Sequence, residues 1–329
     1  MARQVKLTVV LVLATLLSFF PVPGTLAADD NLFIMKGDLH VHTTFSHDGE
    51  QIPAQVIAAS MTAGYDFVAF TEHNTTAHLK KDHSTDKMLV IAGYEHTTPV
   101  AHMNIYGIRA IPKKADINTK EEMEEYLAPL REQGAIIQLN HPNSSNYYSR
   151  FGYDIDFDFL EILNGSFSKD DHKTLNDYQT LLCEGRRLIA TGGTDVHRNY
   201  TVRAVYNNVL VRERSEEAVL EGLLAGRNFV TVKPDGPVIS MECDGVIMGG
   251  TVSYVEDQKV TVIIDNMEPH TIVRIFTSNG LTLEEVFQPI SGGKYLVEVP
   301  TDGVTFVRVE VWYDDARLCA FSNPIYIEQ

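Results

Sequence analysis

Short apolar runs alternate with stretches of helical periodicity between about residues 40 and 231, and this alternation is what most constrains the fold. Buried strands are predicted at Phe67–Phe70, Met88–Ile91, Ala135–Leu139, Phe159–Leu163 and Leu188–Ala190. Helices are predicted between them; in one, Thr119 and Glu122 form a capping box and Gly134 closes the helix. Strands that alternate with helices indicate an α/β domain with parallel strands.

Polar residues follow these strands at a consistent place. Six of them stand at or just beyond the carboxyl end of a predicted strand: His42, His73, Glu95, His141, Asp195 and His197. In parallel α/β folds, and above all in barrels, functional sites are built at the carboxyl ends of the strands. We therefore expect these side chains to meet on one rim.

The strongest local signal is His40-Val41-His42, which follows the apolar run Leu32–Met35 and precedes Asp48 by six residues. Residues i and i+2 of a strand point to the same face, so the two imidazoles can converge as half of a metal site. An isolated His-x-His recurs by chance. The matching groups at later strand ends argue against coincidence here.

Nine residues are predicted metal ligands: His40, His42, Asp48, His73, Glu95, His102, His141, Asp195 and His197. Imidazoles and carboxylates hold divalent ions at neutral pH, and a site with several ions needs a bridging carboxylate, a role assigned to Glu95. With Glu95, one ion would bind His40, His42 and Asp195. A second ion would bind His102 and His141, and a third cluster would contain Asp48, His73 and His197. His47 competes with Asp48, and a core position is the alternative for His102.

Such a centre lowers the pKa of bound water and polarises a phosphoryl or carbonyl oxygen, so metal-assisted hydrolysis is predicted. The expected nucleophile is a metal-bridging water or hydroxide. The predicted catalytic residues are His40, His42, Glu95, Asp195 and His197. Glu72 is expected to orient an imidazole rather than to bind metal. Substrate contacts are assigned to Asn143, Asn164 and Arg198, with loop capping or a surface role as the alternative.

Helical periodicity stops near residue 235, where short alternating runs begin. They are Val238–Met241, Lys259–Ile264, Ile272–Thr277, Lys294–Val299, Phe306–Trp312 and Ala320–Ile327. Turn pairs such as Asn279-Gly280 separate these runs, a pattern typical of a small antiparallel β-sandwich. The predicted division is a signal peptide at residues 1–28, a hydrolase domain at 29–234 and a β domain at 235–329.

The amino terminus resembles a cleavable signal peptide, with Arg3 and Lys6 before the apolar stretch Leu7–Phe20 and small residues near Ala27. We expect a secreted or periplasmic protein without a stable membrane anchor. The chain without residues 1–28 has 25 basic and 44 acidic residues, and a field of that sign disfavours nucleic acid. A small anionic ester is still a possible substrate if metal cations dominate the local field. The sequence carries no signal for an oligomeric state.

Five motifs occur in order along the chain: Asp38-Leu39-His40-Val41-His42-Thr43, Thr71-Glu72-His73-Asn74, Gly93-Tyr94-Glu95, Asn140-His141-Pro142 and Gly193-Thr194-Asp195-Val196-His197. Together they resemble the PHP (polymerase and histidinol phosphatase) family over about residues 34–230. The secreted form and the β region are similar to the CehA/McbA-like branch of PHP metallo-hydrolases.

This resemblance implies an α/β fold, a distorted (β/α)7 TIM-like barrel, followed by a small all-β immunoglobulin-like sandwich. It also implies two or three divalent metal ions, commonly zinc, manganese or iron. Most members are phosphoesterases, and carbamate ester hydrolysis is known in the named branch. The leading hypothesis is hydrolysis of phosphate mono- or diesters. The alternatives are a carbamate, ester or amide hydrolase at the same centre and a non-catalytic, metal-stabilised binding protein.

Overall fold

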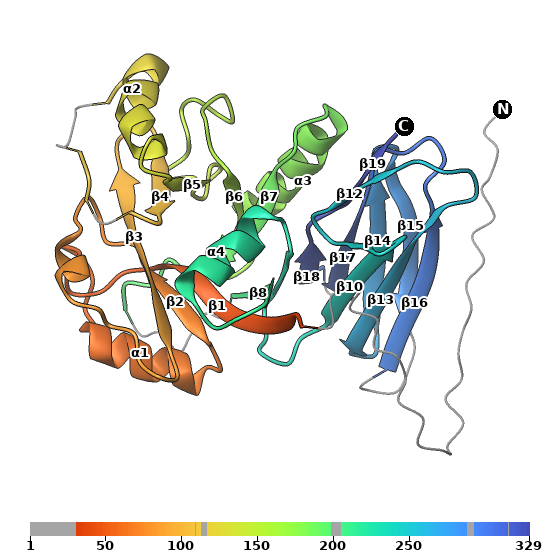
Figure 1. Ribbon diagram of the computed structural model, residues 1–329, viewed down its shortest axis with the longest axis horizontal. Helices are drawn as coiled ribbons and strands as arrows, with labels where there is room; N and C mark the ends of the chain where they lie inside the picture. Colours follow the sequence, from red (N-terminus) through yellow and green to blue (C-terminus); the bar gives the residue numbers. More distant parts are fainter. Residues whose placement is uncertain (1–30, 109, 113–116, 199–204, 288–292, 315) are drawn as a thin grey trace. The chain divides into compact units, whose positions relative to one another are not determined.

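A computed structural model describes residues 31–108, 110–112, 117–198, 205–287, 293–314 and 316–329 (Figure 1). The predicted signal peptide lies outside the described residues. The chain forms two compact units, one of residues 33–224 and 228–234 and the other containing residues 225–227 and 235–329. Among the described helices, none has the length and apolar character needed to cross a bilayer.

The first unit is built on consecutive strands that lie side by side in chain order. They are β1 (Phe33–Val41), β2 (Phe67–Phe70), β3 (Leu89–Thr97), β4 (His102–Tyr106), β5 (Ile136–Leu139), β6 (Phe159–Asn164) and β7 (Ile189–Gly193). The pairs β1–β2, β2–β3, β5–β6 and β6–β7 are parallel. The segment after β7 returns to β1, where Asp195 N donates to His40 O (2.8 Å) and His42 N donates to Val196 O (3.1 Å). The sheet is thereby closed, which confirms the predicted α/β class with a parallel core.

Strand β4 departs from the predicted parallel order, because it is antiparallel to both β3 and β5. The cause is the short connection before it. Only residues 98–101 separate β3 from β4, whereas a parallel neighbour requires a crossover of about a dozen residues or more.

Two further strands extend the sheet beyond β1. Strand β8 (Tyr206–Val211) is antiparallel to β1, and β9 (Asn228–Thr231) is antiparallel to β8. The buried side chain of Asn207 on β8 bridges β1 and β7: its amide donates to Gly37 O (3.2 Å) and Gly192 O (2.7 Å) and accepts from Gly192 N (3.0 Å). Asn207 therefore ties β8 to the two strands on either side of the barrel closure.

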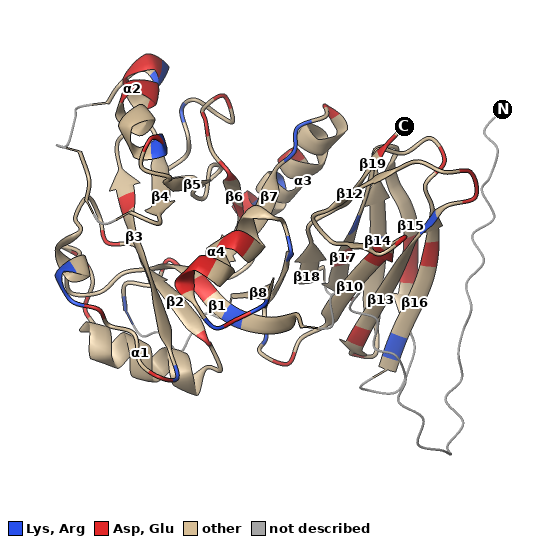
Figure 2. Cartoon of the chain, in the orientation of Figure 1, with Lys and Arg blue, Asp and Glu red and all other residues tan. Residues whose placement is uncertain are grey.

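The helices of the first unit are α1 (Pro53–Thr62), α2 (Lys120–Arg131), α3 (Lys169–Cys183) and α4 (Glu216–Leu224), with a 3-10 turn, η1, at Ala77–Lys80. The predicted capping box at the start of α2 is confirmed, since Thr119 Oγ1 accepts from Glu122 N (3.2 Å). Ser168 caps α3 in the same way. The acidic excess of the chain is visible on α4 and on strands of the second unit (Figure 2).

The second unit contains two sheets. One consists of β10 (Val238–Cys243), β11 (Val246–Ile247), β13 (Lys259–Met267) and β16 (Gly293–Pro300). The other contains β12 (Thr251–Ser253), β14 (Thr271–Thr277), β15 (Gly280–Phe287), β17 (Phe306–Tyr313), β18 (Leu318–Ser322) and β19 (Ile325–Glu328). The pairing is antiparallel apart from β12–β19.

The sequence missed three strands of this unit, the short β11 and β12 and the longer β15, and merged two others. Strand β15 was not predicted, because its outward residues leave it only weakly apolar. The run predicted at Ala320–Ile327 is two strands, β18 and β19, separated at Asn323-Pro324. Proline lacks the amide hydrogen that a continuous ladder needs, so the ladder along β17 is interrupted there, although β18 and β19 both run antiparallel to β17.

Candidate metal centre

The nine predicted ligands approach one another at one rim of the barrel. Four overlapping groups have ligand atoms within 4.8 Å of one another: His40–His42–Glu95, His40–His141–Asp195, Glu95–His102–His141 and His42–His73–His197. Asp48 joins the last group, because its Oδ2 lies 3.4 Å from Nε2 of both His73 and His197. Since the groups share members, they form one continuous cluster.

Glu95 lies in the middle of this cluster and is fully buried. Its Oε1 is 3.1 Å from His102 Nδ1 and 3.6 Å from His141 Nε2, while its Oε2 is 2.6 Å from His73 Nδ1 and 3.7 Å from His42 Nε2. Burial raises the pKa of Glu95, but hydrogen bonds from the surrounding histidines outweigh it and hold the pKa well below its usual value. An ionised carboxylate with different histidines on its two oxygens has the position expected of a bridging ligand.

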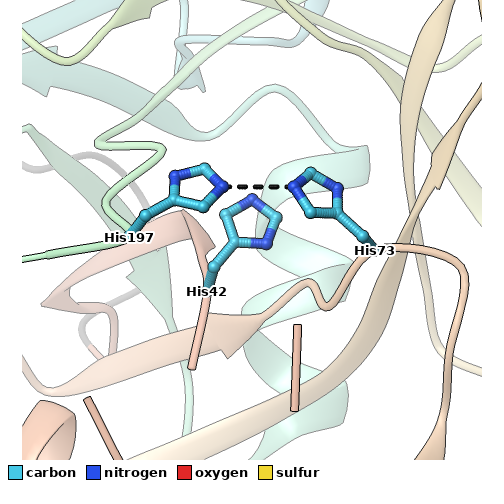
Figure 3. Close-up of side chains that lie close together, drawn as sticks. All are labelled: His42, His73 and His197. Carbon is cyan, nitrogen blue, oxygen red and sulfur yellow. Dashed lines mark hydrogen bonds between the residues drawn. The ribbon is translucent and has the colours of Figure 1, made fainter. Parts of the chain in front are cut away.

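Three imidazoles make up the outer part of the cluster (Figure 3). His73 Nε2 and His197 Nε2 are 3.1 Å apart, and the ring of His42 stacks on both, with ring centroids 4.2 and 4.1 Å away. Asp48 faces this group. The neighbouring His47 has a side chain that is 78% exposed, and its Nε2 is 3.8 Å from Asp48 Oδ2.

Hydrogen-bond acceptors behind His40 and His197 determine which ring nitrogen faces the cluster. His40 Nδ1 donates to Glu161 Oε1 (2.9 Å), and His197 Nδ1 donates to the carbonyl oxygen of Asp195 (3.0 Å). Because a carboxylate or carbonyl only accepts, each Nδ1 carries a hydrogen, and Nε2 is the ring nitrogen left to bind a metal ion. Nε2 of His40 and His42 is buried without a hydrogen bond in the described part of the chain. Orphaned buried lone pairs beside carboxylates fit a bound cation.

Glu72 orients His42 indirectly, in agreement with its predicted supporting role. Its buried carboxylate accepts from Thr43 N (3.0 Å), Thr43 Oγ1 (2.6 Å) and Ser46 Oγ (2.7 Å). With its proton directed at Glu72, the oxygen of Ser46 accepts from His42 Nδ1 (3.2 Å) and from His73 N (3.0 Å). One hydroxyl therefore positions two of the predicted ligands.

Glu161 on β6 is the main residue that sequence reasoning missed. Besides holding His40, its carboxylate accepts from His141 N (2.9 Å) and from Asn164 Nδ2 (3.1 Å). The available signal was a charged residue inside the apolar run Phe159–Leu163, because a buried carboxylate requires partners. That run predicted a strand, and the carboxylate within it was not assigned a role.

Backbone geometry brings these groups close together. A Cβ atom on Gly193 would lie 2.3 Å from His40 Cβ and 2.7 Å from Glu161 Oε1, so only glycine allows β7 to approach β1 here. His141 and Asp195 adopt positive φ angles of 27° and 49°. Non-glycine residues rarely adopt this conformation, which the surrounding structure must stabilise.

The three predicted substrate residues lie in different surroundings. Asn164 is beside the cluster, with Nδ2 3.4 Å from Asp195 Oδ2. The amide of Asn143 instead donates to Tyr153 Oη (2.8 Å), Thr174 Oγ1 (3.1 Å) and Asp177 Oδ2 (2.9 Å). Arg198 is exposed and pairs with Glu50 at 3.1 Å. The structure thus brings Asn164 to the centre and gives Asn143 and Arg198 other partners.

The electrostatics of the cluster favour cations. Burial raises the pKa of Asp195, but His40 and His42 outweigh it and hold this pKa far below its usual value. Burial lowers the pKa of His42 to about 4. For His40, His73 and His141 burial acts in the same direction, yet the neighbouring carboxylates prevail and raise the pKa. Ionised carboxylates that draw protons to imidazoles would also draw metal ions, which compete for the same lone pairs.

No family model and no curated protein matches this sequence. The fold is similar to the crystal structure of a two-domain protein from Bacteroides vulgatus, described as containing a predicted PHP-like metal-dependent phosphoesterase. The two chains are 16% identical, the match covers 90% of this chain and 96% of that chain, and the TM-score is 0.52. An amidohydrolase from Chromobacterium violaceum matches 49% of this chain and 87% of its own at 14% identity. Its TM-score of 0.33 does not establish a shared fold. The first likeness shows that the two-domain architecture is shared.

Proposed function

We propose that this protein is a metal-dependent hydrolase of phosphate mono- or diesters. The observation that carries the proposal is the pair of buried, unbonded Nε2 atoms of His40 and His42, both directed at the carboxylates of Glu95 and Asp195. The fold shared with a protein described as a predicted PHP-like phosphoesterase supports the same chemistry.

The donor set fits zinc, manganese or iron, which accept imidazole nitrogen and carboxylate oxygen together. His40, His42, Glu95 and Asp195 would hold one ion, and Glu95 with His102 and His141 would hold the next. Asp48, His73 and His197 would hold a third. The ions would supply Lewis-acid activation of water and of the phosphoryl oxygen.

The chain's own groups orient the reactants and control access to the centre. Glu161 and Ser46 keep the proton of His40 and His42 on Nδ1, so that Nε2 faces the cluster. The side chains of Asp48 and His197 are 38% and 25% exposed, whereas those of His40 and His42 are fully buried. The centre is therefore open on the side of Asp48 and His197. An open site favours catalysis, because structural metal sites are closed by their ligands.

The test combines metal analysis with hydrolysis of three substrates: 4-nitrophenyl phosphate, bis(4-nitrophenyl) phosphate and a naphthyl carbamate, each with manganese or zinc. We expect bound metal and release of 4-nitrophenol from a phosphate ester. Asp195→Asn should abolish turnover, and Asp235→Asn, which changes an exposed carboxylate, should leave it unchanged. Release of naphthol without release of 4-nitrophenol would show that the enzyme hydrolyses carbamates and not phosphate esters. Retention of metal without hydrolysis of any ester would refute the hydrolase and favour a binding protein.

We also propose that the protein is exported and meets a small anionic ester outside the cytoplasm. The support is the charged, apolar and small-residue pattern of residues 1–28. Mass spectrometry of the protein recovered from a bacterial periplasm or culture medium should show a chain that begins near residue 28. Recovery of the intact chain from the cytoplasm alone would contradict export.

A further inference from the structure

Tyr147 is a large aromatic residue beside the metal centre that the proposed chemistry does not use. Its ring lies 5.1 Å from that of His102, tilted by 30°, and 6.5 Å from that of His141. Both histidines are buried, yet Tyr147 is 60% exposed. The ring therefore borders the centre while most of its surface faces solvent.

Tyr147 belongs to the segment 142–153, which directly follows His141 and forms part of the connection between β5 and β6. Ser144 N donates to His141 O (2.9 Å), and Ser149 N donates to Pro142 O (3.0 Å). Arg150 N donates to Val100 O (2.7 Å), which lies in the turn between β3 and β4. Backbone hydrogen bonds on both sides of Tyr147 thus fix the segment to the rim that carries the predicted ligands.

The segment 142–153 also lines most of a cavity of about 390 Å³. Tyr148, the next residue after Tyr147, lines it, and so does Pro142, which directly follows His141. Serine hydroxyls and the ring of Tyr153 complete much of the wall. The one charged lining residue is Lys173, whose ammonium is 2.6 Å from Asp177 Oδ2 and so is already paired. The volume is within the range of small-molecule sites, and the lining suits an uncharged group.

We propose that Tyr147 and this cavity form the subsite for the alcohol part of the ester, and that this part is an uncharged aromatic ring, a phenol. The inference rests on the proposed hydrolase function. In the reaction the phosphorus–oxygen bond to the phenol breaks, the oxygen of water bonds to phosphorus, and one proton of that water leaves with the phenol. An exposed tyrosine face gains offset stacking with a flat ring, which a saturated ring cannot provide.

The kinetic test compares the phenyl and cyclohexyl esters of whichever phosphate class the enzyme hydrolyses. For each protein, kcat/KM for the phenyl ester is divided by kcat/KM for the cyclohexyl ester. Comparing this phenyl-to-cyclohexyl ratio between a variant and the parent cancels the intrinsic reactivity of the two alcohols. Tyr147→Ala should lower this ratio about 2- to 10-fold, the size of an aromatic pair. Tyr147→Phe keeps the ring and should leave the ratio unchanged. An equal loss for both esters in Tyr147→Ala would overturn the subsite, because the ring would then only shield His102.

A binding measurement separates this inference from the proposed function. Saturation-transfer NMR on the metal-free full chain should show contact with phenol, weaker contact with cyclohexanol, and loss of the phenol signal in Tyr147→Ala. If the parent hydrolyses no ester but binds phenol through Tyr147, the hydrolase fails and the aromatic subsite stands. If phenol binds parent and Tyr147→Ala equally, or binds neither, the subsite is refuted whatever the hydrolysis assays give.

Discussion

Replacing Glu161 with glutamine should weaken metal binding although Glu161 is not itself a predicted ligand. Its two oxygens serve different partners: Oε1 accepts from His40 Nδ1, and Oε2 accepts from His141 N and Asn164 Nδ2. Glutamine has nearly the same shape but carries one oxygen and one NH₂ group. The substitution therefore changes hydrogen bonding and charge with little change in packing.

Either orientation of the new amide is unfavourable. If its NH₂ group faces His40, the hydrogen of His40 must move to Nε2, which then cannot bind metal. If the NH₂ group faces the other way, it meets the N–H donors of His141 and Asn164, and two hydrogen bonds are lost. Removing such an orienting partner typically costs about 10- to 100-fold in metal affinity, or about 1.4–2.7 kcal/mol.

The assay is a competitive chelator titration with zinc and with manganese, followed by hydrolysis at saturating metal. We expect the metal Kd of Glu161→Gln to rise 10- to 100-fold, with part of the activity restored by excess metal. The matched control is Glu298→Gln, an exposed carboxylate on β16, which should leave the metal Kd unchanged. A Glu161→Gln protein with the parent's Kd would refute the claim that this carboxylate sets the protonation of His40.

Three further predictions concern stability. Glu310→Ala removes the carboxylate that accepts from Arg308 Nη1 (2.7 Å) and Trp312 Nε1 (2.8 Å). The unfolding free energy of the second unit should fall by about 3–5 kcal/mol. Urea denaturation followed by the fluorescence of Trp312, the single tryptophan, measures this change. Asn207→Ala leaves buried groups of Gly37 and Gly192 unpaired and should cost about 2–4 kcal/mol, measured by urea unfolding followed by circular dichroism. Burial lowers the pKa of His78 to about 4, so the folded state binds a proton there less readily than the unfolded state does. As pH falls from 6.5 to 4, the unfolding free energy of the parent should therefore fall by about 3 kcal/mol more than that of His78→Phe. Urea unfolding followed by circular dichroism at each pH measures this difference.

Each of these has a clear contrary result. A Glu310→Ala protein within about 0.5 kcal/mol of the parent would mean that the pair contributes no more than an exposed ion pair. For Asn207→Ala, an unchanged unfolding free energy would show that other groups satisfy the freed backbone. Parallel stability curves for the parent and His78→Phe between pH 6.5 and 4 would place the titration of His78 at its ordinary value.

The sequence predicted those features that depend on local pattern. The capping box of α2 and the alternating strands of the second unit follow from residue type and spacing alone. The rule that sites form at the carboxyl ends of parallel strands is enough to place His42, His73 and Asp195 on one rim. Such features need only the order of elements, not the way in which distant side chains meet.

Features that depend on tertiary contacts could not be predicted from the sequence. Glu161 acquires its role only because Gly193 lets β7 approach His40, across more than 100 residues of sequence. Asn143 follows a strand end as a substrate contact would, yet its amide is held by groups that include Asp177 on α3. A position at the rim therefore did not decide whether a polar side chain faces the metal centre.

His102 shows how a departure from the expected topology can still serve the same site. It is the first residue of β4, and in a parallel strand its position would place it at the opposite end of the barrel. Because β4 runs antiparallel, with His102 paired to Thr97, its amino end lies beside the carboxyl end of β3. The turn between them is closed by Thr98, whose hydroxyl donates to Ala101 O (2.8 Å), and the imidazole of His102 reaches Glu95 at 3.1 Å. The four-residue connection that breaks the parallel order is thus also what brings a histidine to the bridging carboxylate.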